Sequence, residues 1–242
     1  ANKSDYRTSY NFSYLNPYYT IDGVSRGFNV FYRETDFDAF GVSSYATDAY
    51  GGNVTYGYPI SRDSRLSLSL GFDTTKIHAE TFAGTISIDE IREFESLYGL
   101  EFLNYKLTGR WTQNRLNRGV LATAGSHQVV SLETAVPGSD FGYYKATYRG
   151  QKFFPLGNTW SLKFRGDLGY GDGLGSDYDR MPFYEHFFSG GLGSVRGFRS
   201  NSLGMRSSRN GLETINAFGG NILIEGSAEL IFPLPFIEDQ RS

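Results

Sequence analysis

Arg196 is the residue of this chain whose type and surroundings most clearly suggest a specific interaction. It lies in a glycine-rich stretch and is followed by Gly197 and Phe198. Because a guanidinium group is always charged, an arginine that folds into the protein needs a carboxylate partner. Two acids, Glu225 and Glu229, alternate onto the same polar face of the last predicted strand. The pattern indicates an ion pair that fastens a loop to a strand, and a solvated Arg196 without a partner is the alternative.

Other residues that could do chemistry are arranged unfavourably for it. The histidines, His78, His127 and His186, share neither a strand face nor a spacing typical of metal ligands. The glycine-rich run at 169–175 is followed by no Lys-Ser or Lys-Thr pair, which a phosphate-binding loop requires, and we expect it to form a crowded loop entrance instead. The sequence therefore predicts no catalytic residue, no metal site and no cofactor, and the protein is expected not to be an enzyme.

The composition favours a folded all-β protein. Of the 242 residues, 39% are hydrophobic and 17% are aromatic, which is too apolar for a disordered chain. No run approaches the ~18 consecutive apolar residues of a membrane-spanning helix. The 30 glycines and 18 tyrosines are typical of a transmembrane barrel. The net charge is −3 with both signs spread along the chain, so nucleic acid is not an expected partner.

Polar and apolar side chains alternate along much of the chain with the period of a β-strand. Leu66, Leu68 and Leu70, for example, alternate with Arg65 and Ser67, which gives the segment one apolar and one polar face. Charged side chains on the polar faces indicate a hydrated interior. Each predicted strand is near the ~9–11 residues that cross a membrane when tilted. The nine strands span 6–16, 24–35, 50–60, 65–77, 104–114, 126–136, 143–154, 160–170 and 220–232.

The predicted connections alternate in length, as the short periplasmic turns and long outer loops of membrane barrels do. The short ones are 16–23, 61–64 and 156–159, and the long ones are 36–49, 79–103 and 171–219. Two connections depart from this rule. The connection 115–125 is longer than the other turns, and 137–142 is shorter than the other outer loops. The alternation supports a barrel that carries Arg196 in its longest loop.

A short helix is predicted at 88–98, inside the second long loop. Ser87 and Glu90 have the spacing of a capping box, and Gly99 is placed to end the helix in a left-handed conformation. We expect the helix to pack on the rim of the barrel rather than to dock a partner, because surface helices usually bury one face. The apolar face would consist of Ile88, Ile91, Phe94 and Tyr98.

The stretch around Arg196 resembles the sixth outer loop of the BamA family of outer-membrane β-barrel assembly proteins, which carries a (Val/Ile)-Arg-Gly-(Phe/Tyr) motif. TamA and the two-partner secretion transporters, which belong to the wider superfamily, share Arg-Gly-(Phe/Tyr) but not this flanking sequence. His186 departs from the family, which usually has Asn there. The resemblance extends across essentially the whole chain. The matching segments are 169–175, 182–185, 190–191, 195–198, 200–201, 227–233 and the predicted turns at 15–18, 21–25, 57–60, 117–119 and 137–140.

The resemblance implies an antiparallel transmembrane β-barrel of about sixteen strands. This chain would be a partial barrel domain that spans 1–242 and carries about the fourth to the twelfth strands. The first and last barrel strands and the periplasmic POTRA repeats are expected to be absent. The long loop would fold into the lumen, where Arg196 would pair with Glu229. Glu225 stays a candidate for an additional acid because of its place on the same polar strand face. Gly197 and Phe198 would complete this structural latch.

By the same resemblance, the protein is expected in the outer membrane of a Gram-negative bacterium, as the core insertase that folds and inserts outer-membrane proteins without ATP. Its expected partners are unfolded outer-membrane proteins, outer-membrane lipids, and accessory lipoproteins bound through the POTRA repeats. The alternative is a passive channel or protein-secretion pore of the same superfamily, in which Lys163, Arg165 and Asp167 would tune conductance. A surface adhesin is a third hypothesis, suggested only by the aromatic long loops.

Overall fold

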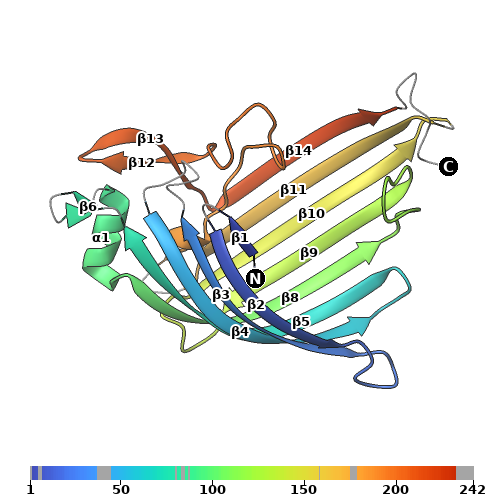
Figure 1. The fold of residues 1–242 in the computed structure, drawn as a ribbon, viewed down its shortest axis with the longest axis horizontal. Coiled ribbons are helices and arrows are strands. Elements are labelled where there is room, and N and C mark those ends of the chain that lie inside the picture. Colours follow the sequence, from blue (N-terminus) through green and yellow to red (C-terminus); the bar gives the residue numbers. More distant parts are fainter. Residues whose placement is uncertain are drawn as a thin grey trace.

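The computed structural model describes residues 2–4, 7–36, 45–79, 81–82, 85–86, 88–157, 159–174 and 179–232. Ten strands form one antiparallel sheet, in which strands that follow one another in the sequence lie side by side (Figure 1). The nine predicted strands are confirmed. In order across the sheet, the strands are β1 (Asn2–Ser4), β2 (Arg7–Asn16), β3 (Ser25–Asp36), β4 (Tyr45–Pro59), β5 (Ser64–Ala79), β8 (Glu101–Asn114), β9 (Gly125–Ala135), β10 (Tyr143–Pro155), β11 (Ser161–Gly173) and β14 (Ile222–Ile231).

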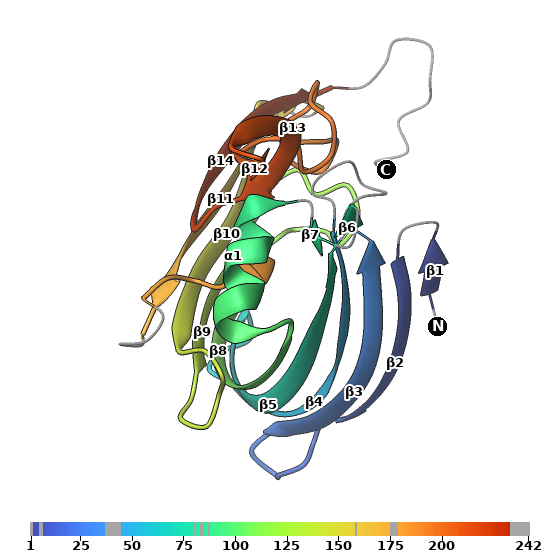
Figure 2. The same ribbon diagram turned by 90° about the vertical axis from the view of Figure 1, so that its left-hand side faces the viewer.

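The sheet curves into a trough, which Figure 2 shows nearly end-on. Within the described residues, β1 and β14 form its two edges. Helix α1 (Asp89–Tyr98) and the hairpin of β12 (Met205–Arg209) and β13 (Leu212–Gly219) lie together at one end of the trough, and the short turns lie at the other (Figure 1). The helix and the hairpin, which belong to two different long connections, thus share one end of the sheet.

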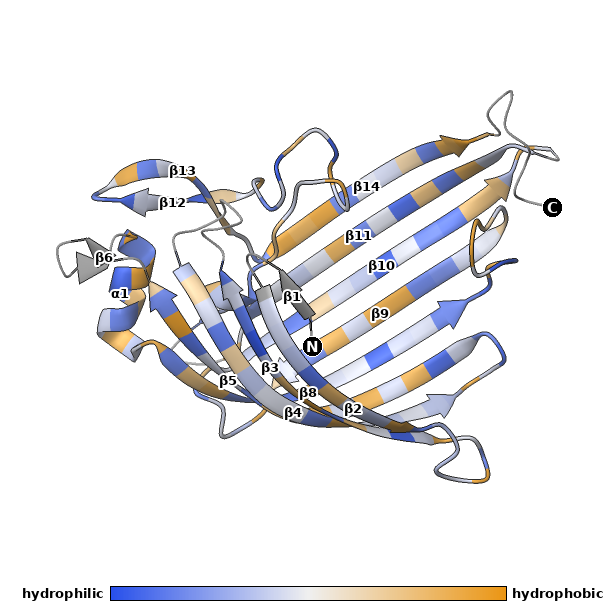
Figure 3. Cartoon of the chain, viewed as in Figure 1, coloured by the Kyte–Doolittle hydropathy of each residue, from blue (hydrophilic) through white to orange (hydrophobic). Residues whose placement is uncertain are grey.

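Polar and apolar side chains alternate between the two faces of the sheet, and Figure 3 shows this alternation as stripes of hydropathy along β11 and β14. Apolar side chains of the convex face remain exposed, among them Phe12, Leu68 and Ile224, with 66%, 56% and 78% of their surface accessible. The concave face carries buried charged side chains such as Asp73 and Asp167. A water-soluble sheet would bury its apolar face, so this inverted arrangement suits a sheet that is surrounded by lipid.

The strand boundaries differ from the predicted ones where pairing with neighbouring strands continues beyond the predicted segment. β4 begins at Tyr45 instead of residue 50, because its first residues continue the antiparallel pairing with β3 as far as Asp36 and Ala46. The predicted long connection at 36–49 is therefore too long. Of that connection, residues 37–44 lie outside the described residues. The short strand β1 also escapes the sequence pattern, because three residues are too few to show a period.

Helix α1 confirms the predicted helix and its apolar face. Ile88, Ile91 and Phe94 are all buried. The Phe94 ring packs among four other aromatic rings, those of Tyr98, Phe102, Phe141 and Phe183, at centroid distances of 5.3, 5.4, 5.4 and 5.1 Å. The helix thus packs on the rim of the sheet through this face, and the aromatic core lies between the helix, the ends of the strands and the long loop.

The ends of α1 differ from the prediction. The helix begins after Ile88, whose side chain makes no cap, and Ser87 lies outside the described residues. The Glu90 carboxylate accepts hydrogen bonds from the backbone amide and the hydroxyl of Ser208. Because Ser87 is not among the described residues, the predicted capping box between Ser87 and Glu90 stays a prediction. Gly99 follows the helix with a positive φ of +84°, but its ψ of −162° is not left-handed helical.

The hairpin of β12 and β13 lies inside the longest connection, for which the sequence pattern predicts no strand. Its turn is Asn210-Gly211, with φ angles of +53° and +75°, as a two-residue hairpin turn requires. The Asp89 carboxylate of α1 accepts hydrogen bonds from the backbone amides of both turn residues, at 3.1 and 2.8 Å. Helix and hairpin are therefore fastened together, although 121 residues separate Asp89 from Asn210.

Three smaller elements complete the described structure. Strands β6 (Thr81–Phe82) and β7 (Thr85–Ile86) pair with each other, and a 3-10 helix, η1 (Phe183–Glu185), lies near the start of the longest connection. In the part of the chain that the structure describes, no helix is both long enough and apolar enough to cross a membrane.

Candidate functional site: the long loop and its contacts with the inner face

The connection between β11 and β14 folds back over the concave face of the sheet. Gly169 and Gly171 of β11 lie on that face and leave room for it. A methyl group at Gly169 would lie 2.7 Å from the Phe187 ring, and one at Gly171 would overlap Met181. The glycine-rich run is therefore crowded, as predicted. It belongs to the end of β11, and the returning loop packs on it.

Replacing Gly169 by alanine is expected to lower the free energy of unfolding by about 1–3 kcal/mol, because the added methyl group overpacks the contact with Phe187. Gly166 is a matched control on the same strand, since the atom nearest to an added methyl group there lies 3.9 Å away. Urea unfolding of the full-length protein measures both changes. Equal effects of Gly169→Ala and Gly166→Ala would contradict the packing of the loop on β11.

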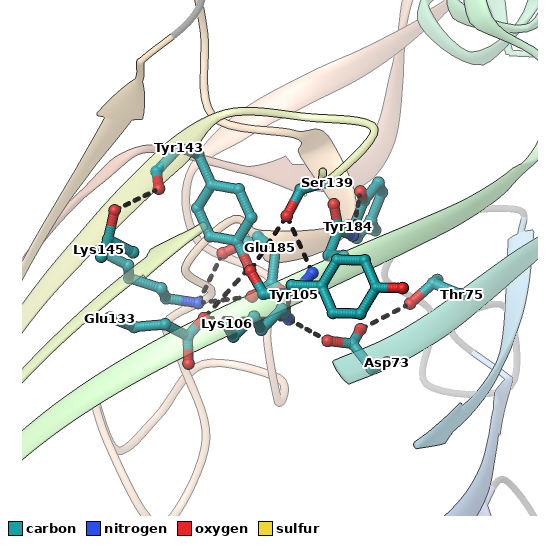
Figure 4. Close-up of polar contacts among 12 residues, drawn as sticks. Asp73, Thr75, Tyr105, Lys106, Glu133, Ser139, Tyr143, Lys145, Tyr184 and Glu185 are labelled. Atoms are coloured by element: carbon teal, nitrogen blue, oxygen red, sulfur yellow. Dashed lines mark hydrogen bonds and ion pairs between the residues drawn. The ribbon is translucent and has the colours of Figure 1, made fainter. Parts of the chain in front are cut away.

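The start of the loop is anchored by an ion-pair cluster around Glu185, which Figure 4 shows in close-up. The Glu185 carboxylate lies 2.7 Å from Nζ of Lys106 on β8 and 3.3 Å from Nζ of Lys145 on β10. Lys145 also donates to the backbone carbonyl of Glu185, at 2.7 Å. The three side chains are only 17% to 21% accessible, so these charge-assisted bonds are largely shielded from solvent.

Acids of the wall complete the Glu185 cluster. Asp73 on β5 lies 2.9 Å from Nζ of Lys106, and Glu133 on β9 lies 3.9 Å from the same atom. Tyr143 on β10, which is fully buried, donates its hydroxyl to Glu133 at 3.1 Å. The cluster therefore connects one loop residue to four neighbouring strands of the wall, β5, β8, β9 and β10.

The cluster makes the stability of the protein depend on pH. Burial alone would raise the pKa of the Glu185 carboxyl, but the ammonium groups of Lys106 and Lys145 lower it from 4.5 to about 2. A carboxyl with a lowered pKa in the folded state stabilises the fold fully above its unfolded pKa, and this stabilisation is lost as the pH falls through the folded pKa.

We therefore expect the free energy of unfolding to fall more steeply between pH 4.5 and about 2 in the wild type than in Glu185→Gln. Chemical unfolding of both proteins at several pH values in this range makes the comparison. Parallel curves would mean that the Glu185 carboxyl does not gain its charge stabilisation from the two lysines.

Farther along the loop, two hydrogen bonds hold it to the last two strands of the sheet. The Arg165 guanidinium on β11 donates to the backbone carbonyl of Gly193, at 2.7 Å. The Ser194 hydroxyl donates to the Glu225 carboxylate on β14. Glu225, considered from the sequence as an additional partner of Arg196, thus contacts the loop through Ser194.

In the structure, Nη2 of Arg196 lies 3.6 Å from Oε1 of Glu229. Arg196 keeps 71% of its side-chain surface accessible, and Glu229 also lies 3.4 Å from Nζ of Lys163. Because the guanidinium is solvated, the contact is expected to contribute about 0.2–1 kcal/mol. Gly197 follows with a φ of +91°, and the Phe198 side chain is 53% exposed.

The Glu185 cluster is the part of this site that the sequence does not predict. Lys106 and Lys145 lie on polar faces of predicted strands, but many other charged residues do so as well. The one signal in the sequence is that Glu185 belongs to the segment 182–185, which resembles the BamA family.

These contacts hold a loop inside a curved sheet whose outer face is apolar and exposed. Such an arrangement defines the wall of a transmembrane β-barrel with a loop folded into its lumen. The Omp85 superfamily domain matches residues 1–242, and the chain belongs to the Omp85 superfamily.

Within this superfamily, the resemblance to BamA is confirmed by sequence and by structure. The chain is 32% identical over 248 residues to the outer membrane protein assembly factor BamA of Neisseria meningitidis, in an alignment that covers 100% of this chain and 31% of that protein. The crystal structure of BamA from Haemophilus ducreyi lacking POTRA domains 1-3 matches with a TM-score of 0.87 and 29% identity, over 97% of this chain and 47% of that one.

A more distant match is a SAM50-like protein of Schizosaccharomyces pombe, which is 26% identical over 143 residues. This alignment covers 57% of the chain and 29% of the yeast protein. The chain thus spans less than half the length of each of these relatives, from 29% to 47%.

Proposed function

We propose that the protein takes part in the assembly of β-barrel proteins in the outer membrane of a Gram-negative bacterium. One observation carries the proposal: a sheet that matches the Omp85 domain throughout binds a long loop along its inner face. The similarity to the assembly factor BamA of Neisseria meningitidis supports the role. The exposed apolar side chains of the convex face support a location in a lipid bilayer.

More specifically, we propose that the whole protein is the core insertase of this assembly machinery. It would work without ATP and without bond chemistry, by lowering the barrier to strand pairing and membrane entry of an unfolded outer-membrane protein. An exposed sheet edge can template an incoming strand in this way. Residues 1–242 would form about the fourth to the twelfth strands of the barrel, and accessory lipoproteins would bind through POTRA repeats.

Arg196 and Glu229, together with Gly197 and Phe198, are proposed to act as a structural latch. The 3.6 Å distance between the two charged groups supports this role, and so does the positive φ of Gly197, which lets the chain turn there. Glu225 supports the same part of the loop through a serine hydroxyl. The latch would hold the loop near the wall and would take part in no reaction.

Depletion of the full-length protein from its bacterium tests the assembly role. We expect folded porins to decrease in the outer membrane, because their insertion would lose its catalyst. Expression of Arg196→Ala is expected to restore the porins only partly, and Arg199→Ala, an exposed arginine of the same loop, is the matched control that should restore them fully. Unchanged porin levels on depletion would refute the assembly role, and full restoration by Arg196→Ala would refute the latch alone.

A passive channel or secretion pore is the second candidate. It is favoured by a polar cavity of about 590 Å³ between the wall and the loop, lined by Arg33, Lys106 and Arg110 among others. An ungated ion current through the full-length protein in planar bilayers, with a selectivity that changes in Arg165→Ala, would favour this candidate. A closed protein that still supports porin assembly would count against it.

A further inference from the structure

The long loop divides into two parts that are attached to the wall differently. We call residues 181–189 the loop root and residues 190–202 the loop tip. The tip closes on itself at a neck, where the Leu203 amide donates to the Ser189 carbonyl at 3.0 Å and the Asn201 amide donates to the Gly190 carbonyl at 3.3 Å. A loop whose ends are joined in this way is a compact Ω-type loop. The tip can therefore change its position without pulling on the root.

The loop root is held by buried contacts. Met181 and Phe183 are 2% and 4% accessible. Phe187 exchanges two backbone hydrogen bonds with Gly220, at 2.8 and 3.0 Å. Between these points, Glu185 forms the ion pairs with the wall described above. Replacing a largely buried acid of this kind leaves its cationic partners without compensation, which costs more than the loss of a solvated ion pair.

The loop tip is held by contacts that water can reach. Leu192 is 87% exposed, and Arg196, which faces Glu229, is 71% exposed. Gly190 and Gly191, at the junction with the root, have φ angles of +111° and +101°, which favour glycine.

Solvated ion pairs contribute little to stability. Among the described residues, the other polar contacts of the tip with the wall are two single hydrogen bonds, from Arg165 to Gly193 and from Ser194 to Glu225. The contacts of the tip are therefore easier to break than those of the root.

We propose that Glu185 is the positioning residue that holds the long loop in the lumen, and that Arg196 holds only the loop tip. The tip can then leave the wall while the root stays bound. Loss of the Glu185 charge frees the root. This inference concerns the attachment of the loop and does not rest on the assembly role.

Hydrogen exchange followed by mass spectrometry, on the full-length protein in lipid nanodiscs, separates the two attachments. Glu185→Gln is expected to speed amide exchange in the root at least about a hundredfold. Arg196→Ala is expected to speed exchange in the tip by no more than about fivefold and to leave the root unchanged. Peptides from β2 and β3 serve as the internal control, because neither strand carries a residue of the Glu185 cluster and their exchange should change in neither variant.

The outcome that would overturn the proposal is an equal acceleration of the root by Arg196→Ala and Glu185→Gln, or no acceleration of the root by Glu185→Gln. Glu185→Asp keeps the charge and should protect the root better than Glu185→Gln. If Glu185→Gln does not fold, Lys145→Gln removes one of the two cationic partners and should loosen the root without loosening the tip. Failed assembly with the expected exchange pattern would count against the proposed function only.

Discussion

Replacing Lys106 by methionine is expected to lower the free energy of unfolding by about 3–5 kcal/mol. The Lys106 Nζ lies 2.7 Å from Glu185, 2.9 Å from Asp73 and 3.9 Å from Glu133. Methionine has a similar length and fills much of the space, but it leaves three largely buried acids with Lys145 as the remaining cation of the cluster. Equilibrium unfolding of the full-length protein in urea measures the loss.

Lys163→Met is the matched control for this prediction. Its Nζ lies 3.4 Å from one acid, Glu229, which also faces the solvated Arg196, so its loss is expected to cost about 1 kcal/mol, less than that of Lys106. Adding Glu185→Gln to Lys106→Met should recover part of the lost stability, because it removes one of the uncompensated acids. Equal losses in Lys106→Met and Lys163→Met would contradict a central role for the cluster.

Replacing Phe94 by alanine is expected to cost about 3–5 kcal/mol, because the Phe94 ring fills the centre of the aromatic core. This ring is 6% accessible and lies 5.1 Å from the ring of Phe183 in the loop root. The substitution would leave a cavity between α1 and the root. Both chemical unfolding and proteolysis within α1 should therefore report a weaker structure than in the wild type.

Leu97 offers the matched control, since it belongs to the same helix but is 65% exposed. Leu97→Ala removes an apolar side chain without opening a cavity, so its effect is expected to stay within about 0.5 kcal/mol. If Phe94→Ala destabilised the protein no more than Leu97→Ala does, the helix would not depend on the aromatic core for its position.

The nine long strands follow from the sequence because each has one face toward an apolar and one toward a polar environment. Leu66, Leu68 and Leu70 are exposed on the convex face, while Asp73 farther along β5 lies within the Glu185 cluster. This contrast produces a period of two that survives without any knowledge of neighbouring strands. Strand ends are less visible, because the start of β4 is fixed by its pairing with β3 and β5.

The hairpin of β12 and β13 has a turn signal in the sequence, although its strands are too short to show a clear period of two. Asn210-Gly211 is the dipeptide most typical of a two-residue hairpin turn. Its flanking strands are short, with five and eight residues, and several of their polar residues contact α1 or one another. The contacts of Glu90 are equally hard to predict from local pattern. Its spacing from Ser87 suits a capping box, but nothing near it in the sequence indicates its hydrogen bonds with Ser208, 118 residues away.

The contacts of the long loop with the wall could be predicted only in part. Arg196 and Glu229 can be paired as candidates because a motif and a polar strand face restrict the choice. Glu185 is separated from Lys106 by 79 residues, and local pattern does not tell which loop residue descends to which strand. The tertiary fold alone brings them together. It also shows that the more buried ion pairs lie at the root of the loop and not at Arg196.

The measurement that tests the assembly role most directly is the folding rate of an unfolded porin in liposomes that contain the full-length protein, with ATP absent. We predict faster folding than in empty liposomes, with a smaller acceleration by Arg196→Ala and by Glu185→Gln, because both variants loosen the loop. A wild-type protein that is folded in the liposomes but does not accelerate the porin would contradict the assembly role and would favour the pore.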